Sequence, residues 1–324
     1  MENMNIIGIT RVFNEDDIIE SFVRHHSIFF NFHIFIDNGS SDQTVDILIK
    51  LKNEGFNIIL FENKSIIFQE MQINTEFYKF ANNMNPDWIM YIDADEFIDI
   101  RNSENLFYET LKIQKEDIES VLFELNNYQN TFEDDHDEIA VPVRITHRLP
   151  CGSNVWKTAV RGQIRSNVVI EAGNHGVIID DRYARDCKSH QVKLAHFNRR
   201  SVWQELTKII IGHLKVISTG KEAKERNWSA HYKPFYEKIK NKPWEILKSD
   251  YLLSKDNKNG QYFYDPMNYL GGDLRYTNKT DYDMKSIISI INYFENLSQS
   301  HGDIVDLLRE NNIESMHSVI RRIF

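Results

Sequence analysis

The chain has few cysteines: among 324 residues there are two, Cys151 and Cys187, and neither belongs to a Cys-x-x-Cys or Cys/His cluster. This scarcity excludes a disulfide framework and a thiolate zinc site, and it favours a reducing compartment. No apolar run reaches the roughly 18 residues needed to span a bilayer, and no basic-then-apolar leader opens the sequence. The net charge of −10 argues against sequence-independent nucleic-acid binding. We therefore expect a cytoplasmic protein without a nucleic-acid partner.

Apolar residues are plentiful, at 41%, which is enough for a full core. From Asn5 to Ile100 short β-like runs alternate with longer helical ones, and this pattern is typical of a parallel sheet covered by helices. The predicted strands are Ile6–Ile9, His33–Ile36, Ile58–Phe61 and Trp88–Ile92, and the predicted helices begin after Asn14, after Ser40 or Ser41, and at Met71. Gly55 should end the second helix. The fold class is therefore α/β, with a mostly parallel central sheet flanked by helices.

The pattern is weaker beyond residue 101. Strands are predicted at Val121–Leu125, Ala140–Ile145 and Val177–Ile179. An amphipathic helix is predicted at Val202–Ile217, with one apolar side made by Trp203, Leu206, Ile210 and Leu214. A change in character near residue 220 divides a first domain, 1–219, from a mainly helical C-terminal region, 220–324.

An acidic tetrapeptide, Asp93-Ala94-Asp95-Glu96, directly follows the apolar run Trp88–Ile92. Its carboxylates should emerge at the carboxyl edge of the sheet, where open α/β folds bind ligands. Oxygen ligands at such an edge suit Mg²⁺ or Mn²⁺ bridging to a diphosphate. Two other acidic pairs, Asp135-His136-Asp137 and Asp281-Tyr282-Asp283, follow no buried strand and serve as internal controls. A helix cap or a solvated acidic turn is the alternative interpretation.

Two more predicted strands bring polar residues to the same edge. The segment Asp37-Asn38-Gly39-Ser40-Ser41-Asp42 ends the second strand, and Asp37 is placed to accept the imide hydrogen of a uracil or thymine ring. The segment Thr10-Arg11-Val12-Phe13-Asn14-Glu15 ends the first strand and forms a third wall of the same crevice. Arg11 is placed there to meet a phosphate. The alternatives are an ordinary strand-turn-helix connection and a solvated arginine.

Three ordered segments, RVFNE, IDNGSSDQT and YIDADEF, carry a resemblance to the family 2-like glycosyltransferases of GT-A fold over roughly the first hundred residues. The resemblance implies a Rossmann-like GT-A fold, a nucleotide-sugar donor with UDP favoured, and a Mn²⁺ or Mg²⁺ cofactor. It implies that Asp37 touches the base, that Asp93 lies by the ribose and metal, and that Asp95, the last acid of the DXD motif, binds metal. The nucleotide-sugar site would also include Arg11, Asn14 and Glu15.

A weaker resemblance continues downstream, to bacterial members with a lysine strand, an isolated histidine and a His-aromatic pair before a helix. The matching segments are Trp156-Lys157-Thr158-Ala159-Val160, Gly173-Asn174-His175-Gly176 and Ala195-His196-Phe197-Asn198-Arg199-Arg200-Ser201. In such enzymes a late histidine commonly completes the metal shell, which makes His196 the first choice and His175 the second. Hydrogen-bonded structural histidines are the alternative. Lys157, Arg199 and Arg200 are expected to neutralise the leaving diphosphate, and solvated basic side chains before a helix are the alternative.

The resemblance also implies inversion at the anomeric carbon, which requires a carboxylate to take the proton of the acceptor hydroxyl. Three acids between the tetrapeptide and the histidines are candidates for this base: Glu124 at a strand end, and Asp134 and Asp135 in a loop. We expect one of them to be essential and the others to be nearly silent.

The favoured function is a hexosyltransferase-type glycosyltransferase that moves a sugar to a glycan or lipid-linked saccharide in bacterial surface polysaccharide synthesis. A sugar nucleotidyltransferase would bring a Gly-rich basic first loop, whereas this loop reads RVFNEDD. A non-catalytic carbohydrate-binding protein on the same fold is the other alternative. Arg321 and Arg322, among apolar residues at the end of the sequence, are compatible with peripheral contact at the inner face of a membrane.

Overall fold

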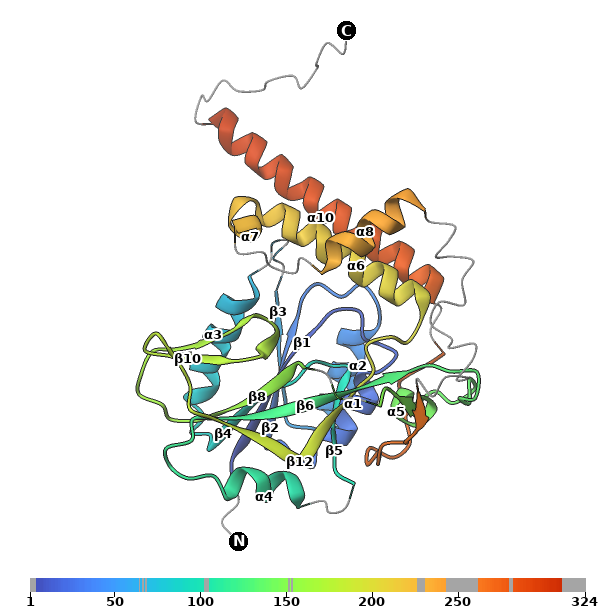
Figure 1. The fold of residues 1–324 in the computed structure, drawn as a ribbon. Helices are drawn as coiled ribbons and strands as arrows, with labels where there is room; N and C mark the ends of the chain where they lie inside the picture. The colour runs from blue at the N-terminus through green and yellow to red at the C-terminus, as the bar shows by residue number, and fades with distance from the viewer. Residues whose placement is uncertain are drawn as a thin grey trace.

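The computed structural model describes residues 4–63, 65, 67, 69–101, 105–150, 152, 154–225, 231–242, 262–279 and 282–310. A central sheet lies between helices, and a further layer of helices covers one edge of it (Figure 1). The predicted α/β class with a helix-flanked central sheet is confirmed. The apolar C-terminal residues around Arg321 and Arg322 lie outside the described residues.

Four parallel strands form one half of the central sheet, in the order β3-β2-β1-β4. They are β1 (Ile6–Val12), β2 (Phe32–Asp37), β3 (Ile58–Glu62) and β4 (Trp88–Tyr91), as the apolar runs predicted. The chain moves outward from β1 to β3 and then returns to the other side of β1, so the direction of winding reverses between β1 and β4. Open α/β sheets bind ligands at the carboxyl ends of the strands beside such a reversal.

The other half of the sheet is mixed. Strand β8 (Trp156–Arg161) runs antiparallel between β4 and β6 (Ser120–Gln129), and β12 (Asp186–His196) runs parallel to β6. Strand β5 (Glu96–Asp99) pairs antiparallel with β12, in a register that sets Glu96 beside His196. Two short strands, β7 (His147–Arg148) and β13 (Phe263–Tyr264), extend the sheet beyond β6. A separate three-stranded sheet contains β9 (Val168–Ile170), β10 (Val177–Ile179) and β11 (Arg182–Tyr183).

Successive strand residues alternate between two cores, because side chains in a strand point to opposite faces. In β4, Trp88 and Met90 join the core beneath α1 (Ile19–His26), α2 (Thr44–Glu54) and α4 (Leu106–Lys112). Ile89 and Tyr91 join the core beneath α3 (Glu70–Asn82). Burial on both faces explains why the parallel strands are almost wholly apolar.

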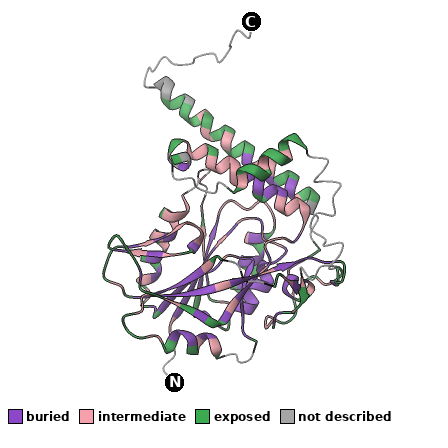
Figure 2. Cartoon of the chain, viewed as in Figure 1, coloured by how far each residue is buried: buried purple, intermediate pink, exposed green. Residues whose placement is uncertain are grey.

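The carboxyl edge of the sheet is covered by α6 (Val202–Thr219), α7 (Lys221–Glu225), α8 (Tyr232–Asn241) and α10 (Tyr282–Glu310) (Figure 1). Figure 2 shows that buried residues concentrate in the sheet and beneath its helices, whereas much of α10 is exposed. Among the described residues, no helix combines the length and the apolarity that crossing a bilayer requires.

Several local predictions were wrong. The predicted strand Ala140–Ile145 contains a short helix, α5 (Val141–Arg144), because Pro142 at its start has a fixed φ and no N–H and so suits a first helical turn. Asn14 caps no helix and instead adopts a positive φ of 57°, while α1 begins at Ile19. Neither Ser40 nor Ser41 caps α2, which begins at Thr44, whose N–H and hydroxyl both donate to Asp42.

The apolar stripe predicted for α6 is only partly buried. Leu206 is buried as expected, whereas Trp203, Ile210 and Leu214 are intermediate. The reason is that α6 lies in an outer layer, between the cavity at the sheet edge and the helices α8 and α10.

The segment 265–277 is fastened to α1 by one buried carboxylate. Glu20 accepts hydrogen bonds from the backbone N–H groups of Arg275, Tyr276 and Thr277, at 2.7, 2.8 and 2.6 Å, and from the side chain of Arg24. Burial by itself raises the pKa of Glu20, but these hydrogen bonds together hold it below its usual value. The ionised carboxylate therefore stabilises the folded state.

We expect Glu20→Gln to lower the free energy of unfolding by about 2 kcal/mol, since a buried group loses charge-assisted hydrogen bonds. This contribution is present above the ordinary carboxyl pKa and disappears as the pH falls through the lowered pKa of Glu20, so mutant and wild type should converge in acid. Glu54→Gln is the control: Glu54 is more exposed, and its partners are the side chains of Arg24, Arg275 and Tyr276. Urea unfolding at several pH values measures both, and equal losses in the two variants would contradict the assignment.

Candidate functional site

A cavity of about 740 Å³ opens at the carboxyl ends of β1 and β4, beneath α6, α8 and α10. Its volume is in the range of small-molecule sites. The sheet side of its lining comes from the loop after β1 (Arg11 to Glu15), the tetrapeptide after β4 (Asp93 to Glu96), and Lys157 on β8. On the opposite side, α6 lines the cavity with residues at helical spacing. Four of them are polar, Gln204, Thr207, Lys208 and Lys215, and the other two are Ile211 and Gly212.

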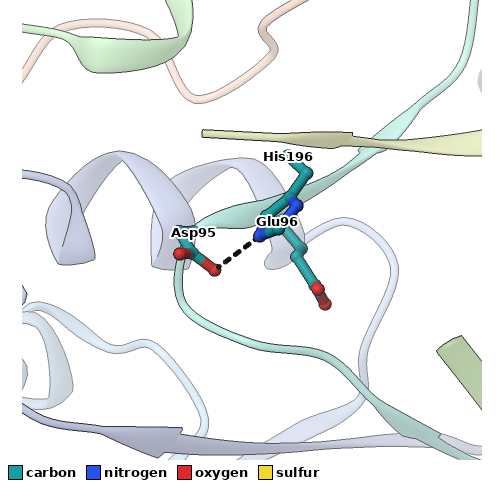
Figure 3. Close-up of side chains that lie close together, drawn as sticks. All are labelled: Asp95, Glu96 and His196. Atoms are coloured by element: carbon teal, nitrogen blue, oxygen red, sulfur yellow. Dashed lines mark ion pairs between the residues drawn. The ribbon is translucent and has the colours of Figure 1, made fainter. Parts of the chain in front are cut away.

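Three side chains at this cavity are arranged as metal ligands. One donor atom from each of Asp95, Glu96 and His196 lies within 4.8 Å of the others. Figure 3 shows Asp95 and His196 facing one another, whereas the Glu96 carboxylate is directed away from them, towards the N–H of Asp93 and Lys157. The Nε2 atom of His196 lies 3.6 Å from an oxygen of Asp95. Two carboxylates and one imidazole form a donor set that suits Mn²⁺ or Mg²⁺.

The ring of His196 is oriented by a neighbour on β6. Its Nδ1 lies 2.8 Å from the side-chain oxygen of Asn127, which can only accept, so Nδ1 carries the proton and Nε2 keeps a free lone pair. Burial lowers the pKa of His196 to about 4, so the imidazole is neutral near pH 7. A neutral ring with its free nitrogen turned towards Asp95 is the state in which histidine binds a metal ion.

Cationic side chains balance the buried carboxylates. The ammonium of Lys157 lies 2.5 Å from Asp93 and 3.3 Å from Glu96. Lys208 and Arg200 lie 3.5 and 3.9 Å from Asp95. Burial by itself raises the pKa of Asp95, but Lys208, His196 and Arg200 outweigh that effect and hold it well below its usual value. Asp95 is therefore ionised near neutral pH.

Two other acids of the site remain close to titration. Burial, reinforced by Asp93 and Asp95, raises the pKa of Glu96 to about 8 against the opposing effect of Lys157. Burial likewise raises the pKa of Glu15 to about 7, although Arg200 opposes the shift. The charge of the cavity lining therefore changes near neutral pH.

Most of the predicted nucleotide-sugar residues line this cavity, namely Arg11, Asn14, Glu15, Asp93 and Lys157. Two others lie behind its wall. Asp37 is nearly fully buried, and its carboxylate accepts from the N–H groups of Gly39 and Ser40, while its neighbour Asn38 reaches the cavity. Arg200 is buried and pairs with Asp17 and Glu15.

The two predicted histidines differ in their position. His196 belongs to the donor cluster, whereas His175 lines the cavity and uses its Nδ1 on the backbone oxygen of Trp156. Asp93, predicted at the metal, faces Lys157 and lies outside the cluster found among the described residues. Glu96, whose role was left open by the sequence, supplies the third donor atom of that cluster. The metal role of Asp93 stays a prediction.

The three predicted base candidates do not line the cavity. Glu124 adjoins the lining residue Leu125 and pairs with Lys193 at 2.6 Å. Asp134 is buried, and it accepts four hydrogen bonds from the N–H and hydroxyl groups of Thr131 and Thr146. Asp135 is exposed. Asp134 thus organises the loop between β6 and β7.

Sequence reasoning missed the contribution of the C-terminal helices to the cavity. Lys215 on α6, Tyr232 on α8 and Ser289 on α10 all line it. The signal for α6 was present, because Lys208, Gly212 and Lys215 recur at helical spacing. No local pattern indicates that Ser289 on α10, 275 residues after Asn14, accepts a 2.5 Å hydrogen bond from the side-chain amide of Asn14.

We expect Asp134→Asn to lower the free energy of unfolding by about 1–3 kcal/mol, because the amide nitrogen cannot accept the hydrogen bonds it replaces. The matched change at the adjacent exposed acid, Asp135→Asn, should stay within about 0.5 kcal/mol of wild type. Thermal unfolding measures both. Unchanged stability of Asp134→Asn would show that this carboxylate does not organise the loop.

No family model matches the chain, and no curated protein matches it. Among solved structures it is similar to residues 1–349 of TarS from S. aureus, with 12% identity over 68% of both chains and a TM-score of 0.39. A mannosyltransferase from Pyrobaculum calidifontis, solved with GDP-Man and Mn²⁺, has 10% identity, covers 68% of this chain and 66% of that one, and has a TM-score of 0.39.

The glucosyl-3-phosphoglycerate synthase of Mycobacterium tuberculosis, solved with Mn²⁺ and UDP, has 18% identity and a TM-score of 0.27. The match spans 38% of this chain and less than half, 44%, of that enzyme. Likenesses at this level do not define a family for the chain.

Proposed function

We propose that this protein is a metal-dependent glycosyltransferase that uses a nucleotide-sugar donor. The observation that carries the proposal is the cluster of Asp95, Glu96 and His196 in a cavity at the winding reversal of a parallel sheet. The donor set suits a divalent cation, and the surrounding lysines and arginines suit a diphosphate. The ordered motifs RVFNE, IDNGSSDQT and YIDADEF, which supply this cavity, point to the same class.

In this proposal the donor lies between the sheet edge and α6. Arg11, Asn14 and Glu15 line the nucleotide end, with Asp37 behind the wall beside Asn38, and Asp93 lies between this end and the metal ligands. Lys157 and Lys208, which pair with Asp93 and Asp95, are placed to turn towards the diphosphate as it leaves. A bound Mn²⁺ or Mg²⁺ supplies Lewis-acid stabilisation of the same leaving group.

The nucleotidyltransferase alternative is disfavoured by the first loop. Glu15 and Asp17 pair with Arg200, and Asp16 pairs with Lys285 on α10 at 2.6 Å. A loop that presents three acids with such partners cannot bind a triphosphate in the way a basic Gly-rich loop does.

We propose a saccharide or lipid-linked saccharide as the acceptor, at the cytoplasmic side of the membrane.

We expect UDP with Mn²⁺ to raise the melting temperature of the wild-type protein more than UDP without metal. Ligand at 100 times its dissociation constant contributes about 2.7 kcal/mol. The metal-dependent part should vanish in Asp95→Asn, because the central ligand is lost. A thermal-shift panel of UDP, GDP and their sugars, with and without Mn²⁺, measures this.

Asp137→Asn is the matched control. Asp137 is the second acid of the Asp-x-Asp sequence Asp135-His136-Asp137, and its side chain is almost fully exposed. It should keep the full metal-dependent shift. Equal nucleotide shifts with and without metal in the wild type would refute the metal-dependent mechanism, and the absence of any nucleotide shift would refute the donor class.

For the catalytic base we propose Glu124, because its neighbour in the sequence, Leu125, lines the cavity, whereas no immediate neighbour of Asp134 or Asp135 does. Glu124→Gln should lower kcat by about 100-fold or more while leaving the nucleotide thermal shift unchanged. Asp135→Asn should leave turnover unchanged, and Asp134→Asn should lose stability in preference to kcat. The rate of UDP release from the UDP-sugar measures turnover in all three variants. Full activity of Glu124→Gln would remove this assignment.

A further inference from the structure

One side-chain amide at the nucleotide end of the cavity has a hydrogen-bond donor to spare. Asn38, directly after β2, lines the cavity beside the loop that follows β1. Its Oδ1 accepts a 2.8 Å hydrogen bond from the Nδ2 of Asn63. Its own Nδ2 donates to no group in the described part of the chain, so this donor is available to a ligand.

The orientation of the Asn38 amide is set by two successive hydrogen bonds from the loop after β3. The backbone N–H of Ser65 is necessarily a donor, and it bonds to the Oδ1 of Asn63 at 3.1 Å. The other end of Asn63 is then its NH₂ group, so the atom of Asn38 that faces it must be the oxygen. Backbone hydrogen bonds hold both residues, from Asn38 to Val12 at 2.9 Å and from Asn63 to Asp37 at 2.7 Å. The NH₂ group of Asn38 is therefore the part left for the cavity.

A second donor at the cavity comes from α6. The ammonium of Lys215, which lines the cavity, lies 4.9 Å from the centre of the Phe13 ring. Within the described ranges it makes neither an ion pair nor a hydrogen bond. Burial lowers the pKa of Lys215 to about 8, so the side chain is still mostly charged at pH 7. A partly buried cation without a carboxylate partner is stabilised when a ligand supplies an acceptor atom.

The side-chain oxygens nearby are already engaged within the protein. The carboxylate of Asp37, behind the wall, accepts from two backbone N–H groups of the turn that follows it. The Oδ1 of Asn14 accepts from the N–H of Ser41 at 2.8 Å, and the carboxylate of Glu70 pairs with Arg11. This end of the cavity therefore favours ligand atoms that accept hydrogen bonds.

A pyrimidine base shows this preference at one atom. Uracil carries the acceptor O4 where cytosine carries an amino group, which is a donor. We propose that the amide of Asn38, held by Asn63, selects uracil over cytosine by donating to O4 of the base. Asn38 thus takes the base contact that the resemblance implied for Asp37. The inference rests on the proposed function, because it specifies the nucleotide of the same donor.

Titration calorimetry of the full chain with UDP and with CDP, both with Mn²⁺, tests the selection, since the two ligands differ only in the base. The wild type should bind UDP about 10-fold or more tightly than CDP, because cytosine would set its amino group against the NH₂ of Asn38. In Asn38→Asp, one carboxylate oxygen keeps the bond from Asn63 and the other accepts from the cytosine amino group. The ratio of CDP affinity to UDP affinity should therefore rise by about 10-fold or more. The added charge weakens both diphosphates alike, so the ratio isolates the base.

Asn63→Ala tests the positioning role separately, because Asn63 does not line the cavity. Without its partner the Asn38 amide is free to rotate, and the preference for UDP over CDP should fall about 3-fold or more. The control is Asn167→Asp, which adds the same charge at an exposed asparagine outside the cavity. It should keep the wild-type ratio. Unchanged melting temperatures without ligand would show that the variants fold.

An unchanged ratio in both Asn38→Asp and Asn63→Ala, with metal-dependent UDP binding intact, would overturn the inference and leave the proposed function standing. Tighter binding of CDP or GDP than of UDP by the wild type would also overturn it. Absence of binding by every nucleotide would refute the donor class and this inference together.

Discussion

Charge balance among buried carboxylates is the constraint on which the site depends. Asp93, Asp95 and Glu96 follow one another at the end of β4, in surroundings where an unpaired carboxylate is costly. Lys157 from β8 and Lys208 from α6 compensate them. The same partners thus surround the cluster of Asp95, Glu96 and His196.

This constraint explains the arrangement of the second half of the sheet. Strand β8 inserts antiparallel beside β4 and thereby carries Lys157 to the tetrapeptide. Strand β12 pairs with β5 and carries His196 to Glu96. The parallel half of the sheet supplies the acids and the first loop, and the mixed half supplies their partners. The helices α6 and α10 then close the cavity from above, with Lys285 of α10 held by Asp16 and Asp42.

The parallel strands were predictable because each is an uninterrupted apolar run bounded by turn residues. The location of the acidic tetrapeptide followed from the same pattern, since the carboxyl ends of parallel strands share one edge. Short elements were less predictable. The run Ala140–Ile145 has strand-like composition, yet Pro142 starts a helical turn there. The expected cap Asn14 serves a tertiary role instead, with bonds to Ser41 and Ser289.

The sequence by itself determined the α/β pattern, the edge at which Asp93 to Glu96 emerge, and the late His196 as a candidate partner. Only the tertiary structure decided that Glu96, and not Asp93, joins Asp95 and His196, because that choice depends on the register between β5 and β12. It also decided that Asp134 holds a loop and that α10 reaches the cavity. Local patterns record the period of an element and its apolar face, whereas contacts between residues more than a hundred positions apart depend on how the completed layers pack.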